Sequence, residues 1–351
     1  MRHRFNEILA LVMALTLVAS FGSATSSASP SKVSSAASKG PFTIGYDIYF
    51  LGNSWSVQLY QEFKNAANHH KSEIKNVIYT SSDGSAAKQT SNVQSLIAKK
   101  VDAIIMTPAS PTASVHVIQQ AKRAGIPVIL LAATANTGDY TAVATVKDQN
   151  FGAVLAKWLA QTLHGKGNIY ALNGIAGLST NSDRWNGAQS VFKHYPGIHV
   201  VASANADWDQ AKGQTATANM LSAHPNVNGV WSQGGAMTLG AIQAFQAAGH
   251  TLVPMTGELN NGFLKKWLQL RKSGNKTFAA AASTKPTTLA VKALDETLRI
   301  LTGQKYDHNF IEPAPLITAK DLNKYVRPNL PDSVWVPTDL TNGQLKKIFS
   351  H

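Results

Sequence analysis

The sequence predicts an α/β protein with two doubly wound lobes, each a parallel sheet covered by helices on both faces. From residue 42 onward, short apolar runs alternate with segments of helical periodicity, which is the pattern of consecutive βαβ units. The chain has 351 residues, 44% of them hydrophobic, which suits two domains of about 150 residues each. Two segments, beginning at Val101 and Val227, also resemble each other as an apolar strand followed by small residues and a helix.

Five apolar runs predict the strands of each lobe. The first set comprises residues 43–50, 76–79, 103–106, 128–131 and 142–146, with helices near 55–69, 86–99 and 112–124. The second set comprises residues 168–172, 199–202, 229–231, 252–256 and 278–282, with helices near 150–163, 182–194, 210–223, 236–248 and 286–302. Ligands of open parallel sheets bind beyond the carboxyl ends of the strands, so we expect the binding site in the turns that follow these strands.

The N-terminal region has the composition of an export signal. Arg2 and Arg4 precede an uncharged apolar run at residues 8–21, and small polar residues follow; this order is typical of a secretory signal peptide. An uncleaved membrane anchor is the alternative, but the run is shorter than the roughly 20 apolar residues that span a bilayer. We therefore expect a signal peptide over residues 1–28. Residues 29–40 are rich in Ser and Ala and have too little apolar content to fold, so we expect a spacer there.

The composition excludes several functional classes. The sequence contains no cysteine, which excludes disulfides, thiolate metal sites and cysteine nucleophiles. Its net charge is +13, but a nucleic-acid-binding surface needs Lys and Arg clustered with aromatic residues. Basic residues gather here only in doublets such as Lys99-Lys100 and Lys265-Lys266. We therefore expect no nucleic-acid partner.

The sequence also lacks the common catalytic motifs. It has no G-x-S-x-G elbow, no G-x-x-x-x-G-K-[ST] loop, no G-x-G-x-x-G turn and no H-E-x-x-H helix, each of which carries a specific chemistry. His69 and His70 end a predicted helix, and His194 and His199 flank a Pro-Gly turn. We interpret these histidines as surface residues, and we expect no catalytic residue, no metal and no cofactor.

Six segments of the chain carry a resemblance to a known family. They are LGNSWSVQL from Leu51, GIPVILL from Gly125, NGIAGLSTNSDRWNG from Asn173, ADWDQAKG from Ala206, LSAHPNVNGVWSQGGAMTLGAI from Leu221 and TGELNNG from Thr256. In this order, within residues 40–317, they resemble the type I periplasmic binding proteins of ABC importers, specifically the ribose-binding kind. The resemblance implies a monomeric extracytoplasmic protein that captures a small sugar, polyol or sugar-like ligand and delivers it to an ABC transporter permease.

The family's architecture implies two lobes joined by three crossings of the chain, with the ligand between the lobes. We expect the crossings near Lys147, Lys285 and Pro313. Residues from 318 onward lie beyond the ribose-type core, and we expect them to strap one lobe. The predicted domains are lobe one, 41–147 plus 285–313, and lobe two with the C-terminal strap, 148–284 plus 314–351.

Four residues match the ligand-binding positions of the family directly. Asn53 and Trp55 match the asparagine and the stacking aromatic at the start of the first helix, Arg184 matches the arginine that holds sugar hydroxyls, and Trp208 matches the stacking aromatic of the second lobe. These residue types also suit a sugar physically. Aromatic rings stack on its apolar faces, and charged planar groups bind its rim of hydroxyls.

At other positions the chain departs from the family pattern. The expected aspartate-arginine pair is Ala132-Ala133, and the expected asparagine after Gln233 is Gly234. Thr284 falls at the position of a hinge glutamine. The family's lobe-two aspartate falls at Gly257 without a gap or at Glu258 with one, and we expect Glu258 because sugar hydroxyls need a carboxylate acceptor. Because a site that lacks these polar partners loses binding energy, we expect ribose itself to bind poorly.

Three further side chains have a structural interpretation. We expect Trp231, within an apolar strand, and Trp267, on a helix face, to pack in the core, and Asp209 to cap the helix that follows it.

Two alternative functions have the same fold. A sensor would present the sugar to a membrane receptor, whereas a DNA-binding regulator is excluded because a signal peptide stands where its DNA-binding helices would be.

Overall fold

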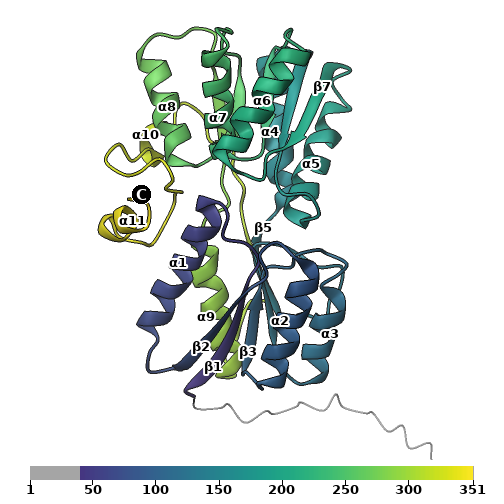
Figure 1. Ribbon diagram of the computed structural model, residues 1–351, viewed down its shortest axis with the longest axis vertical. Helices are drawn as coiled ribbons and strands as arrows, with labels where there is room; N and C mark the ends of the chain where they lie inside the picture. The colour runs from purple at the N-terminus through teal and green to yellow at the C-terminus, as the bar shows by residue number, and fades with distance from the viewer. Residues whose placement is uncertain (1–39, 351) are drawn as a thin grey trace, which may run out of the picture. The chain divides into compact units, whose positions relative to one another are not determined.

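The computed structural model describes residues 40–350. The predicted signal peptide, and all but the last residue of the predicted spacer, lie outside the described residues. The described chain forms two parallel sheets with helices on both faces of each (Figure 1). None of its helices combines the length and apolar character needed to cross a membrane.

Lobe one is built on a six-stranded sheet in the order β11-β5-β4-β3-β1-β2. Helices α1 (Ser54–His69) and α9 (Leu289–Leu301) pack on one face, and α2 (Ala86–Ala98) and α3 (Val115–Arg123) pack on the other. Each face is lined by buried aliphatic residues, and the central strands of the sheet are nearly continuous apolar runs. The strands are β1 (Phe42–Ile48), β2 (Ile74–Ser81), β3 (Ala103–Met106), β4 (Val128–Leu131), β5 (Ala142–Val146) and β11 (Asn309–Glu312).

Lobe two is built on a five-stranded sheet in the order β10-β9-β8-β6-β7. Helices α4 (Asp148–Thr162) and α5 (Ser179–Phe192) cover one face, and α6 (Gln210–Ala223), α7 (Gly235–Ala247) and α8 (Asn261–Lys272) cover the other. The strands are β6 (Lys166–Asn173), β7 (Gly197–Asn205), β8 (Gly229–Ser232), β9 (Met255–Glu258) and β10 (Ala280–Ser283).

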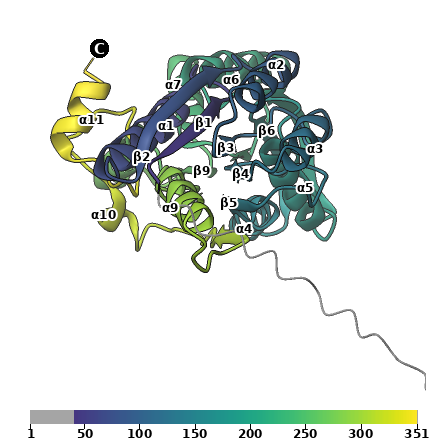
Figure 2. The same cartoon turned by 90° about the horizontal axis from the view of Figure 1, so that it is seen from below.

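Within residues 40–350, the chain crosses between the lobes three times. It leaves lobe one after β5, returns between β10 and α9, and crosses back after β11, where Ile317 forms an antiparallel bridge with Ala282 beside β10. This arrangement confirms the predicted fold class. The C-terminal segment, with α10 (Leu322–Tyr325) and α11 (Asn342–Ile348), then runs alongside α8 and α1 (Figures 1 and 2).

Several elements differ from the sequence-based prediction. Strand β11 was not predicted, because it pairs only with β5 at the sheet edge and its residues are at least partly exposed, so it lacks a continuous apolar run. Strand β9 begins three residues later than predicted and includes Glu258.

The structural predictions for Trp231, Trp267 and Asp209 are confirmed. Trp231 and Trp267 are buried in the core, and the side chain of Asp209 caps α6 by accepting the Lys212 N–H at 2.8 Å.

Candidate ligand-binding site

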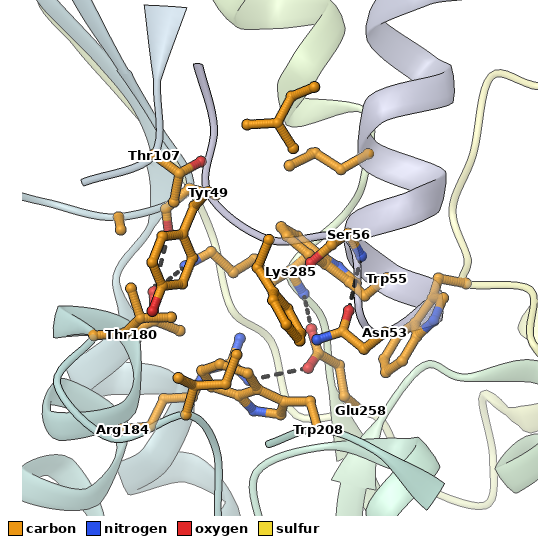
Figure 3. A pocket seen from close by; sticks show the side chains of 18 of the residues that line it. Tyr49, Asn53, Trp55, Ser56, Thr107, Thr180, Arg184, Trp208, Glu258 and Lys285 are labelled. Carbon is orange, nitrogen blue, oxygen red and sulfur yellow. Dashed lines mark hydrogen bonds and ion pairs between the residues drawn. The ribbon is translucent and has the colours of Figure 1, made fainter. Parts of the chain in front are cut away.

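A pocket lies between the lobes at the carboxyl ends of several strands (Figure 3). Its volume is about 70 Å³, counted as the space open to the centres of water-sized spheres. Five of the six residues predicted for the site line it: Asn53, Trp55, Arg184, Trp208 and Glu258. Thr284 does not line the pocket, whereas its neighbour Lys285 does.

The first turn of α1 forms part of the lobe-one wall. Asn53 caps this helix, because its Oδ1 accepts the Ser56 N–H at 2.9 Å, and its Nδ2 donates to the Asp207 carbonyl of lobe two at 3.4 Å. The Trp55 indole N–H donates to the Lys285 carbonyl at 2.9 Å. This bond satisfies the polar end of Trp55 and leaves its ring as an apolar wall.

Trp208 forms part of the opposite wall from an uncommon backbone conformation. Asp207 and Trp208 have φ values of 53° and 55°, a left-handed conformation that bulky residues rarely adopt and that clusters at ligand sites. The indole rests on two glycines. A Cβ on Gly174 would lie 2.1 Å from Cε2 and Cζ2 of Trp208, and a Cβ on Gly234 would lie 2.6 Å from its Cδ1. The space of the family's asparagine side chain at Gly234 is therefore taken by the indole.

Four buried charged side chains form a network at the pocket. Arg184 Nε donates to Asp148 at 2.9 Å and its Nη1 donates to Glu258 at 2.9 Å, while Lys285 Nζ donates to Asp148 at 2.7 Å. Nη1 of Arg184 also donates to the Gln233 carbonyl at 2.8 Å. Figure 3 shows Arg184, Glu258 and Lys285 converging from different elements. The two cations and two carboxylates balance, so the network carries no net charge when all four are ionised.

Burial shifts the protonation equilibria within this network. Desolvation raises the pKa of Glu258 above its usual value, although the charge of Arg184 acts to lower it. Desolvation likewise lowers the pKa of Lys285, although the charge of Asp148 acts to raise it. Burying these four charges without partners would cost desolvation free energy, and the ion pairs among them offset this cost.

The guanidinium of Arg184 has one nitrogen that takes no part in the bonds of the network. Among the residues that the structure describes, Nη2 of Arg184 has no hydrogen-bond partner, because Nε binds Asp148 and Nη1 binds Gln233 and Glu258. Glu258 accepts the Lys285 backbone N–H at 3.1 Å with Oε1 and Arg184 with Oε2, and each carboxylate oxygen has a second lone pair. The pair therefore presents a donor and an acceptor with fixed orientations.

Sequence reasoning did not predict the pocket residues Thr107, Thr180, Lys285 and Trp335. Thr107 directly follows β3, in one of the turns where the rule that ligands bind at strand ends predicts the site, but the rule does not single out the residue. Its position is held by Gln89, whose Nε2 donates to the Thr107 carbonyl at 2.9 Å. The sequence could not indicate Thr180, because its place depends on hydrogen bonds to residues distant in sequence. Its hydroxyl accepts a hydrogen bond from Lys285 Nζ at 2.9 Å and donates to the Ala132 carbonyl at 3.0 Å.

The Ala132-Ala133 pair, where the resemblance implied an aspartate and an arginine, lines the pocket. Ala132 adopts a φ of 64°, a left-handed conformation that is uncommon for residues other than glycine. The two small methyl groups make this wall apolar. No group of three or more metal-ligating side chains occurs within residues 40–350.

The lobes also touch beside the pocket. The Thr134 N–H donates to the Ser179 hydroxyl at 3.0 Å across the cleft. Tyr49 and Ala109 of lobe one form a buried apolar cluster with Leu178 of lobe two. Both lobes therefore contribute packing and hydrogen bonds around the same pocket.

Comparisons with known proteins agree with this architecture. Residues 44–305 match the model of the family described as "Periplasmic binding protein domain". The chain is 26% identical over 289 residues to the ribose import binding protein RbsB of Bacillus subtilis, an alignment that covers 82% of this chain and 91% of that protein. It is 35% identical over 182 residues to a xylitol-binding protein of Mycolicibacterium smegmatis, with 52% of each chain covered.

Solved structures show the same fold. A solute-binding protein of an ABC transporter from Thermobispora bispora superposes with a TM-score of 0.75 at 25% identity, covering 89% of this chain and 95% of that one. Another, from Actinobacillus succinogenes with bound D-allose, superposes with a TM-score of 0.68 at 27% identity, covering 81% of this chain and all of that one. The two lobes are linked by three chain crossings, the pocket lies between them, and residues 44–305 match the family model. This chain therefore belongs to the periplasmic binding protein family.

Proposed function

We propose that this protein is an extracytoplasmic solute-binding protein that captures a small neutral sugar or polyol between its lobes and delivers it to an ABC transporter. The observation that carries the proposal is the pairing of two tryptophans from opposite lobes, Trp55 and Trp208, with the Arg184–Glu258 pair in one pocket. The proposed role is binding without catalysis, in keeping with relatives that are binding proteins.

The walls of the pocket suit the two kinds of surface that a sugar or polyol presents. Carbon-bound hydrogens of the ligand would lie against the indole of Trp55 or Trp208, and its hydroxyls would reach polar groups at the rim. Those groups are Nη2 of Arg184, the carboxylate of Glu258 and the side chain of Asn53. A charged donor and a charged acceptor bind a hydroxyl pair more strongly than neutral groups do.

The charge balance of the pocket favours a neutral ligand over a sugar acid. Arg184 and Lys285 are already paired with Asp148 and Glu258. A ligand carboxylate would add a third negative charge to this buried network, and desolvating that charge without a free cation is costly. The uncharged methyl groups of Ala132 and Ala133 provide no compensating partner.

The relatives support this ligand class. The names of the similar proteins include ribose and xylitol as ligands, and the similar structure from Actinobacillus succinogenes holds D-allose. All three ligands are neutral polyhydroxylated molecules of five or six carbons. With the ribose-type charged pair replaced by Ala132-Ala133, we expect a polyol such as xylitol to bind more tightly than ribose.

Delivery to a permease implies export and a change of shape. We propose that residues 1–28 act as the export signal and that the protein works as a monomer. We further propose that the lobes, which touch through Asn53 and Asp207 in this structure, separate to admit the ligand.

The alternative function is that of a sensor that presents the sugar to a membrane receptor. Genes for a permease and an ATPase beside this one would favour transport, whereas a receptor kinase gene would favour sensing.

A thermal-shift panel tests the ligand class. Xylitol, ribose, allose and myo-inositol would be compared with the acids ribonate and gluconate at the same concentrations. A ligand at 100 times its dissociation constant adds about 2.7 kcal/mol to stability, so a neutral ligand should raise the melting temperature. A larger shift with the acids, or no shift with any neutral compound, would contradict the proposal.

A further inference from the structure

The C-terminal segment, residues 313–350, lies beyond the family-matched residues 44–305 and yet contributes a side chain to the pocket. That side chain is Trp335, which is 3% exposed and lines the pocket together with Trp55. Its indole N–H donates to the Ser54 hydroxyl at 2.9 Å. Trp335 is therefore held against the first turn of α1, the element that also positions Asn53.

The segment is anchored firmly in lobe two. The buried side chain of Asn261 donates to the carbonyls of Arg327, Leu330 and Pro331 at 2.9, 3.1 and 3.0 Å, and accepts the Arg327 N–H at 2.9 Å. Trp335 itself forms an antiparallel bridge with Asn260. Apolar side chains such as Val334 join the lobe-two core. The backbone that carries Trp335 thus belongs structurally to lobe two.

The same segment is tied to lobe one through one stripe of α1. Gln58, which is fully buried, donates to the Trp335 carbonyl at 2.8 Å and accepts the Trp335 N–H at 2.9 Å. Glu62, one turn further along, accepts the Asp339 N–H at 3.2 Å and the Thr338 hydroxyl. Because positions four apart share one helix face, this stripe fixes the backbone of residue 335 beside the pocket.

We propose that Trp335 is a specificity-determining residue that closes one end of the pocket and limits the length of the bound ligand. This inference rests on the proposed function. Ser54 holds the indole at its N–H and Gln58 holds the backbone of Trp335 at both its N–H and its carbonyl, so we expect the ring to form a rigid wall rather than a movable one. A smaller side chain at this position would lengthen the pocket at the end that the indole now fills.

The test compares homologous ligands that differ by one CHOH group. Dissociation constants for xylitol and sorbitol, and for ribose and allose, would be measured by calorimetry on wild type, W335F and W335A. Because a change of one carbon in a fitted pocket alters binding by about tenfold or more, W335A should shift the ratio of dissociation constants about tenfold toward the longer ligand. W335F should shift it in the same direction by less.

A matched control removes a contact that the C-terminal segment makes through a residue outside the pocket lining. Gln344 donates to Asn65 of α1 at 2.7 Å, and Q344A should leave the ratio unchanged. Equal loss of affinity for both lengths in W335F and W335A would show that Trp335 is only structural and would overturn the inference; an unchanged ratio would do so too. Absence of binding of all four ligands to wild type would instead contradict the proposed function on which the inference depends.

Discussion

The Nη1 atom of Arg184 lies 2.9 Å from Oε2 of Glu258, and both side chains are buried while lining the pocket. The pair therefore serves the fold and the site together. Its removal should affect stability as well as binding, in contrast to a residue that only contacts the ligand.

Replacing Glu258 with Gln should destabilise the protein. The new amide would place a donor against Arg184 and leave the two cations with Asp148 as their only carboxylate. Removing one partner of a buried ion pair costs about 3–5 kcal/mol, so urea denaturation of E258Q should show a loss near 3 kcal/mol. As a control, D83N removes the exposed pair between Asp83 and Lys88 and should leave the midpoint nearly unchanged. Equal midpoints for E258Q and wild type would show that the pair contributes no stability.

Glu62 should make stability depend on pH. Burial raises its pKa, which outweighs the hydrogen bonds from Thr338 and Thr287 that lower it. The folded state therefore binds more protons than the unfolded state between the two pKa values, and stability should fall as the pH rises through that window. In E62Q this part of the pH dependence should vanish.

The measurement is the difference between the urea midpoints of wild type and E62Q across mildly acidic to neutral pH. Other buried carboxyls with raised pKa values, such as Asp47, contribute to both proteins and cancel. Parallel curves for the two proteins would contradict the role assigned to Glu62.

Gly174 should be required for the position of the Trp208 indole. A Cβ there would lie 2.1 Å from the ring, so G174A must displace it. We expect a stability loss of about 1–3 kcal/mol from overpacking, together with weaker ligand binding. The control is G138A, because a Cβ on Gly138 meets no atom within 4 Å. Wild-type affinity in G174A would show that the indole does not contact the ligand.

Ligand should compact the protein in solution. A ligand that contacts Trp55 of lobe one and Arg184 of lobe two favours the arrangement in which the lobes touch. Small-angle scattering with and without saturating ligand measures this change, and the radius of gyration should fall. An unchanged radius of gyration at saturation would rule out closure on binding.

Much of this architecture could be predicted from the sequence because buried parallel strands leave an unmistakable apolar pattern. The strands at 103–106, 128–131 and 142–146 are confirmed to the residue. Strand β11 could not be predicted in the same way, since an exposed edge strand needs no continuous apolar run. The C-terminal segment packs on the lobe-two core through irregularly spaced apolar residues such as Val334 and is bound by single polar side chains such as Asn261 and Gln58, and neither leaves a periodic signal.

The site was predictable where a side chain stands at the end of a strand or the start of a helix. Asn53, Trp55 and Trp208 follow this rule, and all three line the pocket. The pocket is lined by Lys285, one residue after the predicted Thr284. Both residues lie in a chain crossing without helical or strand periodicity, so the sequence could not indicate which side chain faces the pocket. Trp335 could not be predicted, because its place depends on contacts with α1 that are 277 residues distant in sequence.

The most direct test of the account is the comparison of W55A, W208A and W267A by calorimetry and urea denaturation. Truncating a ligand contact should weaken binding by about 1–3 kcal/mol with little loss of stability. Truncating the core residue Trp267, which stacks on Phe263, should instead cost about 3–5 kcal/mol of stability. We predict that W55A and W208A bind the best ligand of the panel at least tenfold more weakly than wild type while remaining folded. Wild-type affinity in both variants, with stability losses like that of W267A, would contradict the binding of a ligand between the two tryptophans.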